Sequence, residues 1–318
     1  MKLFRSRPSS RLHQEAAVRA AHLALEHYKN GGYQEALEKI DHALSVLDRS
    51  AMPVQDVSLY GMCLSAKTMI VAALGRYDEA RQMAKTLRGA GAAPASLIAT
   101  AFAELYTGRL NDALRICNEV MAADPDSNSA NGMAATIALL LGDTSYALRL
   151  LDYDSDDPTR LLLLAETHLR DRDSVAAEEA LDLAEPRLPD YAVVILEYRR
   201  LRALAAAHAG DGATMEANLR LLDEAVAHAR HKSWDAAIGR GEALFMIQGF
   251  DAALSAFVQA SGYARHPMDI HITRYWLARA HAALRNKDQA ELLYRAVLAD
   301  GFRTRMSDEA SSALSLGA

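Results

Sequence analysis

The densest set of acidic side chains in the chain is the segment DYDSDDP (152–158). Its first, third and fifth residues are aspartates, as at the start of a calcium-binding loop. Such a loop also needs glycine at its sixth position and a bidentate glutamate at its twelfth, where this chain has Asp157 and Leu163. We therefore interpret the segment as a connecting loop that supplies the N-cap of a helix beginning at Pro158 or one residue later.

Eleven histidines raise the question of a metal site. His228 and His231 lie three residues apart on one expected helix face, but no cysteine, aspartate or glutamate follows them at ligand spacing. We interpret the pair as solvated side chains at a helix end. His168 and His281 fall late in expected helices and have packing roles in our interpretation. We expect no metal site and no cofactor.

Catalytic sequence motifs are also missing. The chain contains no HExxH, GxSxG, GxGxxG or phosphate-binding loop of the GxxxxGK[ST] type. Because catalytic residues can come together from distant segments, this observation lowers the expectation of an enzyme without removing it. We predict a protein without catalytic residues.

The segment EYRRLR (197–202) is the densest basic stretch on any expected helix. We interpret it as a solvated helix face, and the alternative is a docking site for an acidic partner or a peptide carboxylate.

Composition limits the class of protein. Apolar residues make up 51% of the 318 residues and aromatic residues only 6%, which favours a folded, helical chain over a β-sheet fold. The two cysteines, Cys63 and Cys117, lie far apart in helix-like patterns, and no apolar run is long enough to suggest a leader or a membrane span. We expect a cytoplasmic protein with no membrane insertion. Residues 111–186 hold 16 acidic against 5 basic residues, so we expect no nucleic-acid partner.

A recurring turn organises the whole chain. Segments such as GGYQEA (31–36), GRYDEA (75–80) and GRLNDA (108–113) each end in a small residue, at intervals of 30 to 44 residues. Apolar residues recur four and seven positions later, which is the stripe of a helix. The aligned small or apolar residues are Ala36, Ala80, Ala113, Ala147, Ala177, Met215, Ala253 and Ala290.

Glycines and prolines divide these units. Glycine ends the helical patterns at 95–108 and 130–142, because it takes the left-handed conformation without a clash. Prolines such as Pro125 and Pro189 fall where the second helix of a unit ends. Near residue 172 the turn glycine is replaced by Arg172, and Met215 takes the alanine position of the next unit. These two units depart from the common pattern.

The unit LIATAFAELYTGRLNDALRICNEVMAADPDS (97–127) resembles a tetratricopeptide repeat. Gly108 stands at the turn, Ala113 where the two helices approach, and Pro125 at the end. The resemblance implies an all-α fold: an α-solenoid of about eight helix-turn-helix repeats that forms a right-handed superhelix. It is specific for fold and unspecific for function.

We divide the chain into three parts on this basis. Residues 1–9 form a flexible basic tail, residues 10–306 form the solenoid, and residues 307–318 form a capping helix with Ser307 as its N-cap.

In tetratricopeptide arrays the first helix of each repeat lines the concave surface, and this groove commonly takes a peptide or a partner helix. The resemblance therefore places an apolar contact site in the first half of the groove and charged side chains in the second. The partner-binding residues expected from it are Tyr28, Met62, Met69, Phe102, Tyr106, Arg200, Glu242, Tyr275 and Arg279.

Three classes of function remain open at this point. The leading hypothesis is a protein-protein interaction scaffold that binds an extended or helical segment, apolar at one end and acidic at the other. The alternatives are a sensor of signalling peptides or small ligands that recruits a separate effector, as some bacterial tetratricopeptide arrays do, and an enzyme or its accessory subunit. A solvent-closed pocket lined by histidine and acidic residues would support the last class. A homodimer formed through the end of the array is a further alternative.

Overall fold

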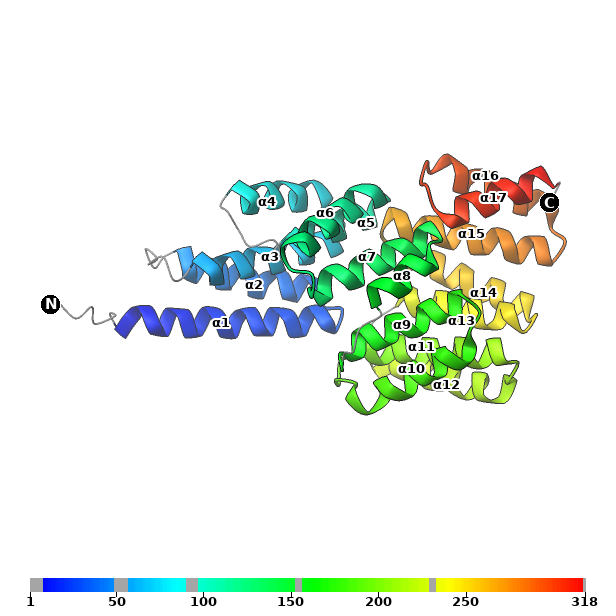
Figure 1. Ribbon diagram of the computed structural model, residues 1–318, viewed down its shortest axis with the longest axis horizontal. Helices are drawn as coiled ribbons and strands as arrows, with labels where there is room; N and C mark the ends of the chain where they lie inside the picture. The colour runs from blue at the N-terminus through cyan, green and yellow to red at the C-terminus, as the bar shows by residue number, and fades with distance from the viewer. Residues whose placement is uncertain (1–7, 49–56, 90–96, 152–155, 229–232, 317–318) are drawn as a thin grey trace.

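The computed structural model describes residues 8–48, 57–89, 97–151, 156–228 and 233–316. These residues form 17 α-helices and no strand (Figure 1). The helices of the first half are α1 (Pro8–Lys29), α2 (Tyr33–Asp48), α3 (Val57–Ala73), α4 (Tyr77–Gly89), α5 (Ile98–Tyr106), α6 (Leu110–Ala123), α7 (Asn128–Leu141) and α8 (Thr144–Leu151). Those of the second half are α9 (Pro158–Arg170), α10 (Ser174–Ala184), α11 (Ala192–Ala209), α12 (Gly212–His228), α13 (Trp234–Met246), α14 (Phe250–Ser261), α15 (Pro267–Ala283), α16 (Lys287–Ala299) and α17 (Arg305–Ser315).

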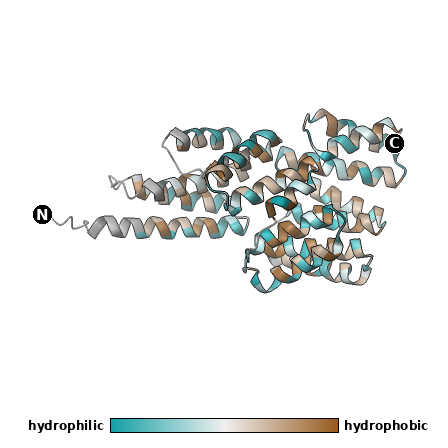
Figure 2. Cartoon of the chain, viewed as in Figure 1, coloured by the Kyte–Doolittle hydropathy of each residue, from teal (hydrophilic) through white to brown (hydrophobic). Residues whose placement is uncertain are grey.

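Each odd-numbered helix from α1 to α15 packs against the even-numbered helix that follows it, and the resulting hairpins stack side by side. The small residue expected at each hairpin is fully buried, Met215 and the alanine after Arg172 included. Hydrophobic and hydrophilic residues alternate along the helices, as Figure 2 shows. The predicted all-α solenoid is therefore confirmed, and the residues aligned at the turns of the two atypical units, Ala177 and Met215, are buried like those of the other units.

The turns between paired helices share a left-handed residue at the end of the first helix. Gly75, Gly108, Gly142 and Gly210 have φ between 74° and 87°. Gln248, Arg172 and Arg285 take the same conformation without being glycine, with φ of 64°, 66° and 63°. The backbone turn is thus kept where the sequence signal is lost, at the cost of a Cβ clash in a left-handed residue.

Replacing Arg285 by glycine is expected to stabilise the protein by about 1 kcal/mol, because relief of the left-handed strain at this exposed position outweighs the greater freedom of glycine in the unfolded chain. Urea unfolding followed by circular dichroism measures the change. Arg285→Ala is the control, since alanine keeps the Cβ and should bring no gain. Equal stability of the glycine and alanine variants would contradict the explanation.

The chain ends of the solenoid differ in part from the expectation. The predicted N-terminal tail lies largely outside the described residues, and α1 begins at Pro8.

The C-terminal helix is present, but Ser307 is not its N-cap. Thr304 caps α17 by accepting the backbone N–H of Ser307, and the Ser307 hydroxyl instead donates to the carbonyl of Phe302 at 2.6 Å. The helix is therefore capped three residues earlier than predicted, at the buried Thr304, which is only 2% exposed.

The aspartate-rich segment has the capping role predicted for it. Asp157 accepts the backbone N–H of Thr159 at 3.0 Å and caps α9, with Pro158 at the first helical position. Asp156 pairs with Arg187 at 2.7 Å. Residues 152–155 lie outside the described residues.

The array closes on itself, although each unit of a solenoid ordinarily contacts only its neighbours. The ring of Tyr106, at the end of α5, stacks on the ring of His266 at a centroid distance of 4.0 Å. The Tyr77 hydroxyl lies 2.6 Å from His266 Nδ1. The ring of Phe302 lies against Gly108, and α17 contacts α7. These contacts join residues that lie between 160 and 194 positions apart in sequence.

Among the described helices, none is both long enough and apolar enough to cross a membrane.

Candidate functional site

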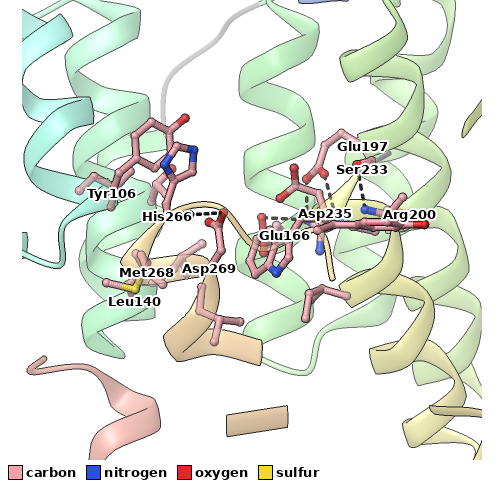
Figure 3. Close-up of a pocket in the computed structure, with 18 of the residues that line it drawn as sticks. Tyr106, Leu140, Glu166, Glu197, Arg200, Ser233, Asp235, His266, Met268 and Asp269 are labelled. Carbon is pink, nitrogen blue, oxygen red and sulfur yellow. Dashed lines mark hydrogen bonds and ion pairs between the residues drawn. The ribbon is translucent and has the colours of Figure 1, made fainter. Parts of the chain in front are cut away.

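The closed array surrounds a cavity of about 580 Å³. Its walls come mainly from the first helix of successive hairpins, α5, α7, α9, α11, α13 and α15, together with α17. One wall is charged and the other is aromatic and apolar. Figure 3 shows the Tyr106–His266 pair on one side of the cavity and the charged group around Arg200 on the other.

The charged wall is a network of five ionised side chains. Arg200 pairs with Glu197 at 2.5 Å and with Glu166 at 3.2 Å, and Arg170 pairs with Glu166 at 3.2 Å and with Glu242 at 3.4 Å. Burial alone would raise the pKa of Glu166, but the two arginines lower it below its usual range. Both arginines are therefore committed to carboxylates of the protein.

A glycine allows the network to form. The Arg200 stem crosses α13 at Gly239, where an added Cβ would lie 2.5 Å from Arg200 Cδ. Any larger residue at this position would displace the Arg200 side chain, so α11 and α13 can approach closely only because residue 239 lacks a side chain.

Asp235, in the first turn of α13, also faces the cavity. The side chain is solvent-exposed within the cavity, although the surrounding walls lie close enough to desolvate its carboxylate. Desolvation by this surrounding protein, with repulsion from Glu197, Asp269 and Glu166 outweighing the attraction of Arg200, raises the pKa of Asp235 to about 7. Within the described part of the chain no ion pair reaches this carboxylate.

The rest of the cavity lining, called the aromatic wall here, is rich in rings and includes Trp234 directly beside Asp235. Seven of the chain's 20 aromatic residues line the cavity, including both tryptophans, in a chain that is only 6% aromatic. They are Tyr33, Phe102, Tyr106, Trp234, Tyr263, Tyr275 and Trp276. Leu139, Leu140 and Ile272 also line the cavity. This concentration of rings is a property of the cavity and not of the composition.

His266 and Asp269 close the cavity between the two walls. Asp269 accepts the backbone N–H groups of His266 and Arg265, at 3.1 and 3.2 Å, in a capping box at the start of α15. Burial lowers the pKa of His266 and raises that of Asp269. Stacking on Tyr106 and the contact with Tyr77 hold the imidazole in place. Both residues therefore have structural roles that their types alone would not indicate.

Of the residues predicted to bind a partner, the structure brings five together in the cavity wall: Phe102, Tyr106, Arg200, Glu242 and Tyr275. The other four lie elsewhere. Tyr28 is half-buried beside Tyr33, Met69 is half-buried in α3, and Met62 is 65% exposed on the same helix. Arg279 packs over the rings of Phe245 and Trp276, with its Cζ 4.8 Å from each centroid.

The interpretation of EYRRLR as a solvated helix face is wrong for its central arginine. Arg200 is 7% exposed and ion-paired, and Arg202 is half-buried against Tyr198 and Asp182. A docking site for an acidic partner would need these cations to be available. Their pairing within the protein removes the basis for that alternative.

Other residues of the cavity were missed by sequence reasoning. Tyr33, Trp234, Asp235 and His266 carry no motif, and they meet only because the array closes. The one available signal was the sequence SWD at 233–235, in which Ser233 caps α13 and places Trp234 and Asp235 in its first turn.

Two arrangements that resemble catalytic or metal sites have structural explanations. His271 lies 3.0 Å from Asp300 Oδ2 and 2.9 Å from the Thr304 hydroxyl, as in a triad, but its side chain is fully buried and fastens α17 to α15 and α16. Burial lowers its pKa, which keeps the imidazole neutral. The described residues include no group of three or more histidine, cysteine or acidic side chains that could hold a metal ion.

The helix pairs, the buried small residue of each pair and the left-handed turn together define a tetratricopeptide-repeat-like α-solenoid, here closed around a cavity. No family model matches the chain, and no curated protein is similar to it in sequence. Solved structures are similar in fold. Human IFIT1, solved as a dimer with m7Gppp-AAAA, matches with a TM-score of 0.51 and 16% identity, over 88% of this chain and 67% of that one.

Two bacterial structures also match. A tetratricopeptide repeat protein from Parabacteroides merdae covers 93% of this chain and 97% of its own, with 13% identity and a TM-score of 0.49. PilF of Pseudomonas aeruginosa covers 76% and 98%, with 16% identity and a TM-score of 0.44. At these identities the similarity concerns the fold and not the function.

Proposed function

We propose that this protein is a non-catalytic interaction protein that captures a short segment of a partner protein in its central cavity. The cavity itself is the observation that carries the proposal. Its volume of about 580 Å³ falls within the ~300–1,000 Å³ of ligand-binding sites, and half-buried rings and charged groups face into it. Helix-hairpin arrays present this surface because the first helices share one side.

The shape of the cavity favours a short occupant. An α-helix with side chains is about 10–12 Å wide and needs an open groove along its whole length, whereas contacts of α15 with α5 and of α17 with α7 bridge the array here. A long helix laid along an open groove is therefore a poorer fit than an extended segment of a few residues. A free signalling peptide of similar length is the second candidate, and the same volume supports it.

Two other classes fit the cavity less well. The human IFIT1 structure contains a capped RNA, but here the cavity's charged wall has more carboxylates than guanidinium groups, which disfavours a phosphate backbone. An enzyme would use the histidine and carboxylates for proton transfer, yet His266 is fixed by Tyr77 and Tyr106.

Two buried, unpaired cysteines, Cys63 and Cys117, support the proposed cytoplasmic location.

A selection from a library of random eight-residue peptides tests the proposal. We expect enriched peptides to bind the wild-type chain and to lose at least tenfold in affinity to Phe102→Asp, which places a charge in the apolar wall. Met62→Asp is the matched control, because Met62 is exposed on α3 and outside the cavity. Circular dichroism confirms that both variants are folded.

The opposite result is equally clear. Failure to enrich any peptide, or peptides that bind Phe102→Asp as well as they bind the wild type, would overturn the assignment of partner capture to this cavity.

A further inference from the structure

The charge balance of the cavity wall is uneven. Four carboxylates, those of Glu166, Glu197, Asp235 and Glu242, face two guanidinium groups, and the set has a formal charge of −2 when all are ionised. The arginines are shared among the three glutamates, at 2.5 to 3.4 Å. Negative charge is therefore in excess in the part of the cavity that Asp235 lines.

The two remaining arginines of the cavity do not correct this balance near Asp235. Arg305 lies on α17 with its Nε 3.5 Å from Glu309 Oε1. Arg265 is exposed in the loop before α15, where its charge acts on Asp269.

Aromatic rings surround the same space, and a cation gains from both features. A guanidinium or ammonium group is attracted to the face of an aromatic ring and to a carboxylate at the same time. Trp234 precedes Asp235 in the first turn of α13, and both line the cavity. The chain already uses this chemistry internally, since Arg279 packs over Phe245 and Trp276 at 4.8 Å.

We propose that the cavity recognises an arginine side chain of the bound segment, with its guanidinium group at Asp235 and its aliphatic stem along the aromatic wall. The inference rests on the proposed function and names the chemistry of the occupant. Arginine fits better than lysine, because its planar group pairs with a carboxylate through two hydrogen bonds and stacks on rings. A metal ion fits worse, because the described residues hold no cluster of ligands for one.

Binding of this cation depends on pH in a stated direction. Asp235 must be ionised to attract it, and the pKa of this carboxyl is raised to about 7. The groups that act on it are Glu197, Glu166 and Asp269, which raise the pKa, and Arg200, which lowers it. Tyr33 also faces Asp235. Affinity for the cation therefore increases from pH 6 to pH 8, as Asp235 loses its proton.

Intrinsic tryptophan fluorescence provides the test, because both tryptophans of the chain line the cavity. The probe is N-butylguanidinium, a free analogue of the arginine side chain, and the control is the neutral N-butylurea. We expect saturable quenching by the cation at roughly millimolar concentration, as for a small ligand with few atoms. Butylurea should bind at least tenfold more weakly.

Two variants locate the site. Asp235→Asn keeps the shape of the side chain and should weaken butylguanidinium binding at least fivefold at pH 8 and abolish its pH dependence. Asp223→Asn is the matched control, since Asp223 pairs with Arg240 on the surface, and it should bind as the wild type does. Equal binding of cation and urea, or unchanged affinity in Asp235→Asn, would overturn the inference.

The two proposals fail in different ways. If selected peptides are lost with Phe102→Asp but contain no arginine and butylguanidinium does not bind, partner capture stands and the arginine inference is wrong. If butylguanidinium binds at Asp235 but no peptide is enriched, the occupant is a free organic cation, and both the partner capture and the arginine of a bound segment are wrong.

Discussion

Replacing Arg200 by methionine is expected to lower the free energy of unfolding by about 3 kcal/mol. Methionine preserves much of the aliphatic stem that crosses Gly239, so the loss comes from the charge. Glu166 keeps Arg170 as a partner, but Glu197 is left without an ion-pair partner among the described residues. The expected cost is at the lower end of the range for breaking a buried ion pair, because the Glu197 side chain is 29% exposed.

Urea unfolding and hydrogen exchange of α11 measure this effect, since a solenoid need not unfold in a single step. A second variant separates charge from packing. Arg200→Met combined with Glu197→Gln removes the orphaned charge as well and should recover most of the stability. If the double variant is as unstable as the single one, the arginine acts through packing, and the electrostatic account fails.

Replacing Gly108 by alanine is expected to destabilise the protein by about 2–5 kcal/mol. Gly108 has φ of 76°, which costs a residue with a Cβ about 1–2 kcal/mol. The new Cβ would also lie within 2.7 Å of three ring carbons of Phe302, and overpacking of this kind costs about 1–3 kcal/mol. The clash with Phe302 weakens the contact that joins the turn between α5 and α6 to the loop before α17.

Gly210→Ala is the matched control for this variant. Gly210 has nearly the same φ, 74°, and nothing lies within 4 Å of an added Cβ there, so only the left-handed cost applies. The difference between the two variants therefore measures the closure contact. We expect hydrogen exchange to increase in α17 for Gly108→Ala and not for Gly210→Ala. Equal destabilisation would show that the Phe302 contact does not constrain the array.

The fold could be predicted from the sequence because its determinants are local. The spacing of Ala113, Cys117 and Val120 is one face of a single helix, and all three residues are fully buried. The same spacing recovered the register at Arg172, where the glycine signal is absent. The beginning of α17 was misplaced, because Thr304 and Ser307 are both good capping residues by type and differ in what surrounds them.

The site could be predicted only in part, because its assembly is not local. Phe102 and Glu242 were found from their positions on first helices, which needs only the repeat register. His266 and Tyr77 are 189 residues apart, and no pattern in the sequence indicates that they touch. The pairing of Arg200 was missed for the same reason, since its network includes Glu166 from another hairpin.

Closure of the array also has a consequence for how the protein forms. A helical hairpin can fold as soon as its own residues are available, whereas the contact between Tyr106 and His266 must wait for the chain between them. Loop-closure entropy grows slowly with length, by about 0.6 kcal/mol for each doubling, so the long connection delays this contact more than it weakens it. During synthesis the first hairpins therefore exist without a complete cavity. The cavity is completed last, when α15 and α17 reach α5 and α7.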